Sequence, residues 1–256
     1  MRFRLLAVAA LLFTSAIAMT GCALFLDAGP QTSQQRGIVD VRAVVLETSG
    51  DLEVTVGATP ALTITAGEKV INRLSSDVEG DTLHLGVSGG PVSFGGEVHY
   101  ALTLPALDAI TVMGSGDAVV DFSASDAPTI EIRGSGDVTA TGITADTASI
   151  SIDGSGDVTA SDLDVRQLTV TIDGAGNISA SGVAETQTIE IRGSGDYAAK
   201  GLSSADARVT IRGAGSVTVH ATETLDATID GSGDIVHTGD PRVTENISGA
   251  GDVRAG

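Results

Sequence analysis

The chain has 256 residues, with 33 Asp and Glu against 14 Lys and Arg, and a formal net charge of −19. Such acidity argues against a nucleic-acid-binding protein, because affinity for phosphates comes mainly from basic side chains. A hydrophobic content of 42% argues against a disordered acidic chain, and the single Cys excludes an intramolecular disulfide.

Residues 1–21 have the layout of a secretory signal peptide. Arg2 and Arg4 precede an uncharged apolar run over residues 5–18, which is shorter than the roughly 20 residues of a membrane-spanning helix. The run ends in a Met-Thr-Gly-Cys sequence at Cys22, which resembles the lipobox of bacterial lipoproteins. We therefore expect Cys22 to be lipidated and to anchor the mature chain to the membrane.

The alternative is an ordinary signal peptide that leaves Cys22 as an incidental thiol. The position of the only Cys in the chain favours lipidation, since a lipid-linked sulfur is not a liability in an oxidising compartment. Ala23 rather than Asp at the next position predicts the outer membrane if the source is Gram-negative. Removal of residues 1–21 leaves 12 basic and 33 acidic residues, a formal charge of −21.

Residues 22–37 are predicted to be the lipidated Cys and a flexible tether, because Pro30 and the Gln-rich stretch after it show no apolar period. The folded domain is expected over residues 38–256. Its first part, residues 38–113, has irregular spacing, and residues 114–256 are regular.

A short glycine motif recurs through the regular part. Gly-(Ser/Ala)-Gly-(Asp/Asn/Ser) recurs at spacings of 18 to 20 residues. The copies begin at Gly114, Gly134, Gly154, Gly174, Gly193, Gly213, Gly231 and Gly249. Eight copies at nearly constant spacing indicate a repeat architecture.

Alternating apolar pairs flank each motif, such as Ile150/Ile152 before it and Val158/Ala160 after it. Alternation with period 2 predicts short strands with one buried face. Strands of three to five residues in a period of about 20 fit one turn of a coil better than a hairpin. We predict an all-β fold, a single-stranded parallel β-helix with rungs of about 20 residues, right-handed by the general crossover preference. The glycines are expected to supply positive φ at a repeated corner.

Upstream, Thr48–Asp51 resembles a degenerate corner motif, and Leu62/Ile64, Leu83/Leu85 and Leu102/Leu104 are candidate strands for about three longer rungs. Together with the Ile-x-Ile-x-Gly-Ser-Gly-Asp repeats and the lipoprotein-like N-terminus, the segment VHYALTLP at residues 98–105 resembles the putative auto-transporter adhesin, head GIN domain family over residues 38–250. The resemblance implies a β-helical, extracytoplasmic protein and offers no catalytic residues to carry over.

The corner acids Asp117, Asp137 and Asp157 occupy equivalent places on consecutive rungs. Carboxylates stacked about 4.8 Å apart repel by roughly 1 kcal/mol in water, so some interaction must offset them. Capping of free backbone N–H groups in Asx turns is the favoured role. Calcium binding between rungs is the alternative and would need many further oxygen ligands. No other cofactor is predicted.

The column just before the corner contains residues of opposite charge on neighbouring rungs. The pairs are Arg133 with Asp153, Asp173 with Arg192, and Arg212 with Asp230. Ion pairs across a sheet face would contribute up to about 1 kcal/mol each and would fix the register of the rungs.

Uniform rungs without a catalytic cluster favour a non-enzymatic adhesion, interaction or scaffold module at the cell envelope. Its predicted partners are the membrane, through Cys22, and a protein or glycan that the sequence does not identify. The alternatives are a calcium-stabilised solenoid and an enzyme acting on envelope polysaccharide. A groove in residues 66–100, where Phe94, His99 and Tyr100 cluster, would indicate the enzyme.

Overall fold

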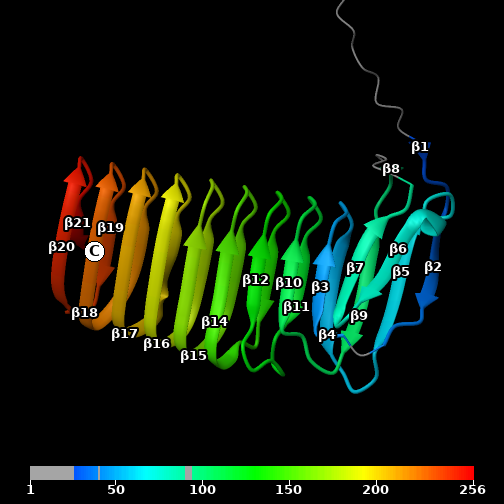
Figure 1. Cartoon of the computed structure of the whole chain (residues 1–256), viewed down its shortest axis with the longest axis horizontal. Coiled ribbons are helices and arrows are strands. Elements are labelled where there is room, and N and C mark those ends of the chain that lie inside the picture. Colours follow the sequence, from blue (N-terminus) through cyan, green and yellow to red (C-terminus); the bar gives the residue numbers. More distant parts are fainter. Residues whose placement is uncertain (1–25, 40, 90–93) are drawn as a thin grey trace, which may run out of the picture.

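The computed structural model describes residues 26–39, 41–89 and 94–256. They form a β-solenoid whose strands are stacked along the long axis of the molecule (Figure 1), which confirms the predicted all-β parallel fold. Within these ranges the helical structure is one 3-10 turn, η1 (Ile71–Arg73), and no helix is long and apolar enough to cross a membrane. The predicted leader and Cys22 lie outside the described residues.

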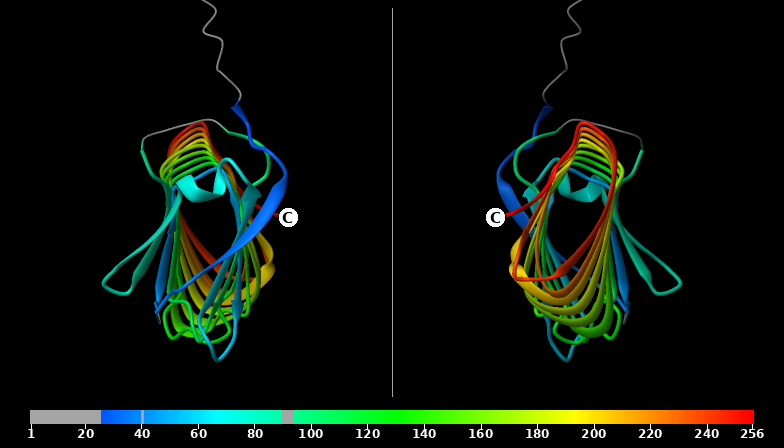
Figure 2. Two further views of the ribbon diagram at one scale, coloured as in Figure 1. Left: turned by 90° about the vertical axis from the view of Figure 1, so that its right-hand side faces the viewer. Right: turned by 90° about the vertical axis from the view of Figure 1, so that its left-hand side faces the viewer.

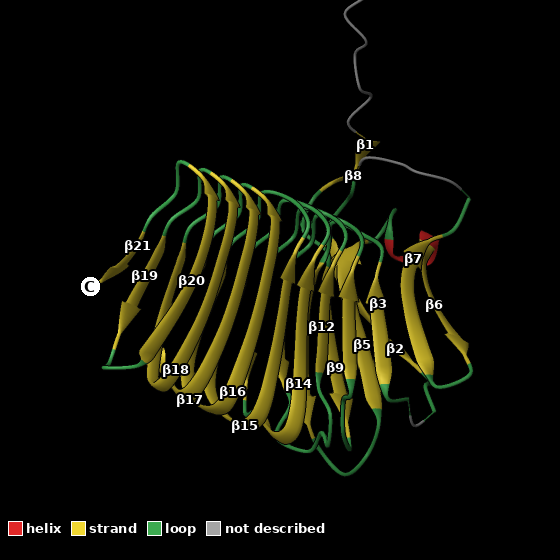
Figure 3. Ribbon diagram, turned by 60° about the vertical axis from the view of Figure 1, so that its left-hand side comes forward, coloured by secondary structure: helices red, strands yellow, loops and turns green. Residues whose placement is uncertain are grey.

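Two walls of parallel strands meet at the Gly-rich corners (Figure 3). The strands before a corner are β7 (Thr82–Val87), β3 (Ala43–Leu46), β10 (Ala109–Val112), β12 (Thr129–Ile132) and β14 (Thr144–Ile152). The strands after a corner are β9 (His99–Leu104), β4 (Asp51–Val56), β11 (Ala118–Asp121) and β13 (Val138–Thr141). The later strands are β15 (Val158–Ile172), β16 (Ile178–Gly193), β17 (Tyr197–Gly213), β18 (Val217–Gly231), β19 (Ile235–Thr238), β20 (Arg242–Gly249) and β21 (Val253–Ala255).

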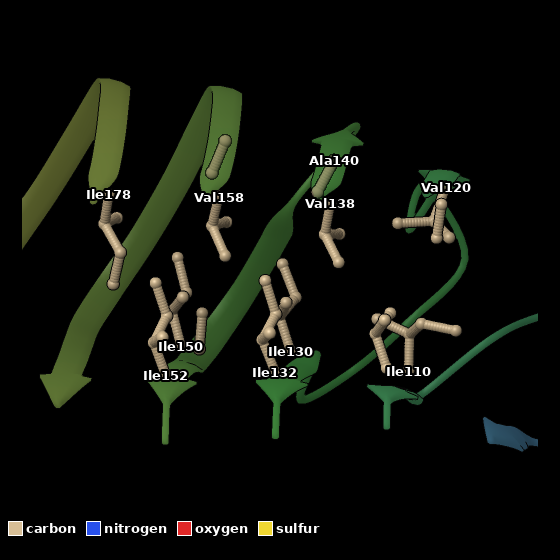
Figure 4. Close-up of a cluster of buried hydrophobic side chains, with 14 of the residues drawn as sticks. Ile110, Val120, Ile130, Ile132, Val138, Ala140, Ile150, Ile152, Val158 and Ile178 are labelled. Atoms are coloured by element: carbon tan, nitrogen blue, oxygen red, sulfur yellow. The ribbon is translucent and has the colours of Figure 1, made fainter. Parts of the chain in front are cut away.

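Equivalent residues of successive repeats lie in register. Ile130 is opposite Ile150, and Ile150 is opposite Val170, so each apolar position forms a column inside the solenoid. The two walls direct these side chains toward one another (Figure 4), and Ile132 and Ile172 are completely buried. Burial of each such side chain contributes about 1.5–3 kcal/mol, and this core holds the walls together.

The regular strands are longer than the sequence predicted. β15 to β18 run for 15 to 17 residues, because the strand continues through the second bend of the rung instead of ending there. The change of direction is absorbed by local irregularities, such as the register shift between Ala160 and Leu163. Asp162, in this bend, adopts a φ of 58°, and its equivalent one rung earlier is Gly142 at 72°.

The N-terminal end is built from antiparallel strands. β5 (Ala61–Gly67) pairs antiparallel with β9 and with β2 (Gln31–Arg36), while β6 (Leu74–Glu79) forms a hairpin with β7. The three candidate upstream strands are confirmed, but β5 is not a rung. The prediction of a flexible tether was wrong for residues 31–36, which form the edge strand β2. Such a strand is held by backbone hydrogen bonds to its neighbour, so its sequence needs no apolar period. Ahead of it, β1 (Leu26–Asp27) pairs with β8 (Phe94–Gly95).

The first rungs do not follow the order of the sequence. β3 lies between β7 and β10, and β4 lies between β9 and β11. The chain therefore forms its first rung with β3 and β4 and then adds a second rung, β7 and β9, toward the N-terminal end of the stack. It continues with β10 and β11 on the opposite side of the first rung. The irregular spacing of residues 38–113 has this cause: the segment contains two rungs and a cap that covers the end of the stack (Figure 2, left).

Close stacking explains the second glycine of each corner motif. A Cβ added to Gly156 would lie 2.0 Å from the carbonyl oxygen of Gly136, and neither Gly156 nor Gly134 adopts positive φ. Positive φ, the reason predicted from the sequence, applies to the first glycine of later motifs, such as Gly193 with a φ of 145°. It does not apply to Gly134 or Gly156. Backbone atoms of adjacent rungs leave no room for a side chain.

We expect Gly156→Ala to destabilise the protein by about 1–3 kcal/mol, because the added methyl group must push two rungs apart. Urea unfolding followed by circular dichroism would measure the change. Gly37→Ala is the matched control, since a Cβ at Gly37 meets nothing within 4 Å. Equal stabilities of the two variants would contradict the steric explanation.

Candidate functional site

The corner acids form one column, and each carboxylate binds the backbone of the next rung. The Asp137 N–H donates to Asp117 Oδ1 at 2.9 Å, Asp157 N–H to Asp137 Oδ1 at 2.8 Å, and Asn177 N–H to Asp157 Oδ1 at 2.7 Å. The predicted capping role is therefore found, but the capped N–H belongs to the neighbouring rung and not to an Asx turn within the same corner.

The column extends beyond the three predicted acids. Asp51 accepts the N–H of Asp117 at 3.3 Å, which confirms that the degenerate upstream motif is a corner. Asn177 accepts the N–H of Asp196 at 3.1 Å and donates its amide to Asp157 at 3.0 Å, so it continues the ladder without a charge. Among the described residues, no group of three or more His, Cys, Asp or Glu could hold a metal ion. The geometry assigns the column to stacking.

We expect Asp137→Ala to destabilise the protein by about 1 kcal/mol, because the Asp157 N–H loses its acceptor. Asp137→Asn keeps an acceptor oxygen, as Asn177 does, and should stay within about 0.5 kcal/mol of the unsubstituted protein. Thermal unfolding with and without a chelator would measure both variants, and the chelator should leave the difference unchanged. A larger loss for Asn than for Ala would show that the charge matters more than the cap.

The predicted ion-pair column is found in part. Asp173 and Arg192 pair at 2.6 Å, as expected. Arg133 instead pairs with Glu131 of its own rung at 2.8 Å, and Arg212 pairs with Glu190. Among the described residues, Arg133 does not pair with Asp153, nor Arg212 with Asp230. Glu131 and Glu190 could have been found from the sequence, because residues two apart on a strand share a face.

Glu190 is shared by two guanidinium groups. The hydrogen bond from Arg192, reinforced by Arg212, holds the pKa of the Glu190 carboxyl below its usual value. The same hydrogen bond, together with Asp173, raises the pKa of Arg192. A lowered carboxyl pKa in the folded state gives stability that is present above the unfolded pKa and is lost as pH falls through the folded one. The network is exposed, so its contribution is small.

His99 and Tyr100, from the segment that would have indicated an enzyme, do not share a site. Tyr100 is completely buried, and burial raises its pKa, while Thr48 donates to its hydroxyl at 3.4 Å. His99, the preceding residue, points to the outside and lies 3.8 Å from Glu53. The side chain of Phe94 lies outside the part of the chain that the structure describes. His99 and Tyr100 thus face opposite sides of β9.

Each rung has a third side, which follows its second bend. On this side, two adjacent hollows of about 730 and 440 Å³ lie mainly on β14 to β18, and we call them the lateral groove. The first is lined by Asp126, Thr144, Ala145, Asp146, Asp164, Val165, Arg166, Val183 and Glu185. The second is lined by Gln167, Thr186, Gln187, Thr188, Asp206, Ala207, Arg208, Thr224 and Asp226. The glycine motif gave no sign of this groove, because the hollows lie after the second bend of each rung and not at the glycine corners.

Each hollow contains one ion pair between rungs. Arg166 pairs with Asp146 at 2.9 Å in the first hollow, and Arg208 pairs with Asp226 at 3.0 Å in the second. Val183 is 55% exposed and adds an apolar surface to the first hollow. With six carboxylates and two guanidinium groups, the lining of the groove is suited to binding polar or cationic groups.

A buried polar network holds Gln187, one of the residues that line the second hollow. Gln187 is 1% exposed, donates to Ser204 Oγ at 2.7 Å and accepts from the Tyr197 hydroxyl at 3.1 Å. Ser204 donates in turn to the carbonyl of His220 at 2.9 Å, and burial raises the pKa of Tyr197. Because these groups satisfy one another inside the core, the side chain of Gln187 is held in place at the second hollow.

Solved bacterial structures share this fold. A protein named as a putative lipid binding protein, from Parabacteroides distasonis, is 24% identical, with a TM-score of 0.80 over 89% of this chain and 97% of that one. A putative adhesin from the same species is 22% identical, with a TM-score of 0.78 over 89% and 97% of the two chains. A putative adhesin from Parabacteroides merdae is also 22% identical, with a TM-score of 0.78 over 90% and 97%. No curated protein matches.

The profile of one protein family matches residues 41–241, which is most of the chain. The match spans the regular rungs as far as β19 and the two rungs at the N-terminal end that the sequence left irregular. The resemblance seen in the Gly-Ser-Gly-Asp repeats is thereby confirmed. The chain belongs to the putative auto-transporter adhesin, head GIN domain family.

Proposed function

We propose that this protein is a non-enzymatic interaction module of the bacterial envelope, held at the membrane by a lipid on Cys22, that binds a protein or glycan through the lateral groove. The observation that carries the proposal is the groove itself: two adjacent hollows on a stiff stack of rungs. The corner carboxylates are engaged with the backbone, so they do not form a second polar site.

The family supports an adhesin-like role, and solved structures of the same fold are named as putative adhesins. One similar structure is named as a putative lipid binding protein. The six carboxylates of the groove disfavour an anionic lipid headgroup here, since they would repel it. A partner that presents amines or hydroxyl groups matches the lining better.

We expect charge reversal in the groove, by Asp146→Lys together with Glu185→Lys, to weaken binding of the purified protein to intact cells by about tenfold or more, which corresponds to about 1.4 kcal/mol. Each substitution places a cation where the partner's donors would lie. Fluorescently labelled protein and a saturation curve would measure the affinity.

The matched control is Thr139→Lys together with Thr159→Lys, which adds the same two side chains to an exposed wall away from the groove. Equal binding by the two double variants would refute the groove as the contact surface. Turnover of a polysaccharide or ester substrate that vanishes when one groove acid is replaced would favour the enzyme instead.

For the anchor, we expect Cys22→Ser to move the protein from the membrane fraction to the soluble extracytoplasmic fraction, since the hydroxyl cannot receive the thioether lipid. Fractionation and metabolic labelling with a radioactive fatty acid would follow the change. Label incorporated into the Cys22→Ser variant, or its retention in the membrane fraction, would contradict lipid anchoring at this residue.

A further inference from the structure

The two ends of the solenoid differ. At the N-terminal end, the antiparallel strands β2, β5 and β6 cover the first rungs. At the other end, β20 pairs with β18 and β21 pairs with β19, and no described strand pairs with their outer edges (Figure 2, right). Unpaired N–H and C=O groups along such an edge are a template for another strand.

The last rung also exposes the cross-section of the core. Ile247 continues the column of Ile211 and Ile229, which are completely buried, yet it is 39% exposed. Val243 and Val253 are only partly buried against the same core. A further strand beside β20 would bury Val243 and Ile247, so the edge is an apolar surface as well as a hydrogen-bonding one.

One acid interrupts this surface. Glu245 is opposite Ala227 in the register, and Ala227 continues the inward column of Ile189 and Val209. All three of those residues are buried and apolar, whereas Glu245 is exposed and forms no ion pair among the described residues. Any strand added to the edge would bury this carboxylate. Inward-pointing charges on edge strands are a device against unwanted pairing.

Apart from Glu245, the edge is complementary to itself. Two copies meeting tail to tail about a two-fold axis would pair β20 with its own copy in antiparallel orientation. Because side chains alternate along a strand, the register that places Val243 opposite Ile247 of the second copy also places Glu245 opposite itself. Two carboxylates facing each other in a closing apolar interface oppose this contact directly, since both would lose water without gaining a partner.

We propose that the outer edge of the C-terminal rung, β20 and β21, could pair with a second copy of this chain and that Glu245 prevents this pairing, so that the protein remains a monomer. Replacement of this single carboxylate converts the edge into an isologous interface with Val243 and Ile247 at its centre. The contact closes at two copies, because the symmetry uses up both edges.

Light scattering coupled to size-exclusion chromatography tests the proposal on the full chain in a Cys22→Ser background. The unsubstituted background should have the mass of one chain, and Glu245→Val the mass of two. Thr244→Val is the matched control, because it adds the same side chain to the outward face of the strand and should remain a monomer. Glu245→Val combined with Ile247→Lys should return to the monomer.

A cysteine reports the register. Glu245→Cys should form a disulfide-linked dimer on mild oxidation, and Asn246→Cys should not, since residue 246 is not opposite itself in this pairing. A monomeric Glu245→Val with an unchanged circular dichroism spectrum would overturn the proposal, and so would assemblies larger than two. If Glu245→Val does not fold, Glu245→Gln removes the charge and keeps the size of the side chain. A monomeric Gln variant would then overturn the proposal.

Discussion

At each corner, the backbone of one rung lies directly against the backbone of the rung before it. The second glycine of the motif has its Cα so close to the preceding carbonyl that a methyl group would approach to 2.0 Å, as at Gly156 over Gly136. Glycine at this position lets the corner backbones stack at the spacing that hydrogen bonding between the parallel strands requires. The close stacking allows the backbone N–H of one rung to reach the carboxylate of the preceding rung, and it brings the apolar columns into van der Waals contact.

Stacking identical rungs also stacks identical charges, and the structure relieves this repulsion in three ways. Corner carboxylates accept backbone N–H bonds, and Asn177 interrupts their run with a neutral side chain that does the same. On the adjacent wall, acids and arginines alternate closely enough for Glu190 to hold both Arg192 and Arg212. A chain with this excess of acids can therefore remain in register.

Because the corners and walls are fixed by stacking, variation is confined to the third side and the two ends. The lateral groove lies where the rungs change length and the strands continue through their bends. The N-terminal end is capped by strands of opposite direction, while the C-terminal end is left open and carries Glu245 in a core position. The surfaces with a capacity to bind are thus the ones that the repeat does not dictate.

The sequence by itself determined the rungs. Period 2 within a strand, a period near 20 between corners, and glycine where backbones touch are local requirements, so Ile-x-Ile-x-Gly-Ser-Gly-Asp predicted a parallel solenoid and its core. The tertiary structure alone decided the strand made by Gln31–Arg36, the exchanged order of the first rungs, the partner of each Arg, and the lateral groove. These depend on which backbone edge is free and which side chains meet across rungs, and such long-range contacts leave no periodic trace in the chain.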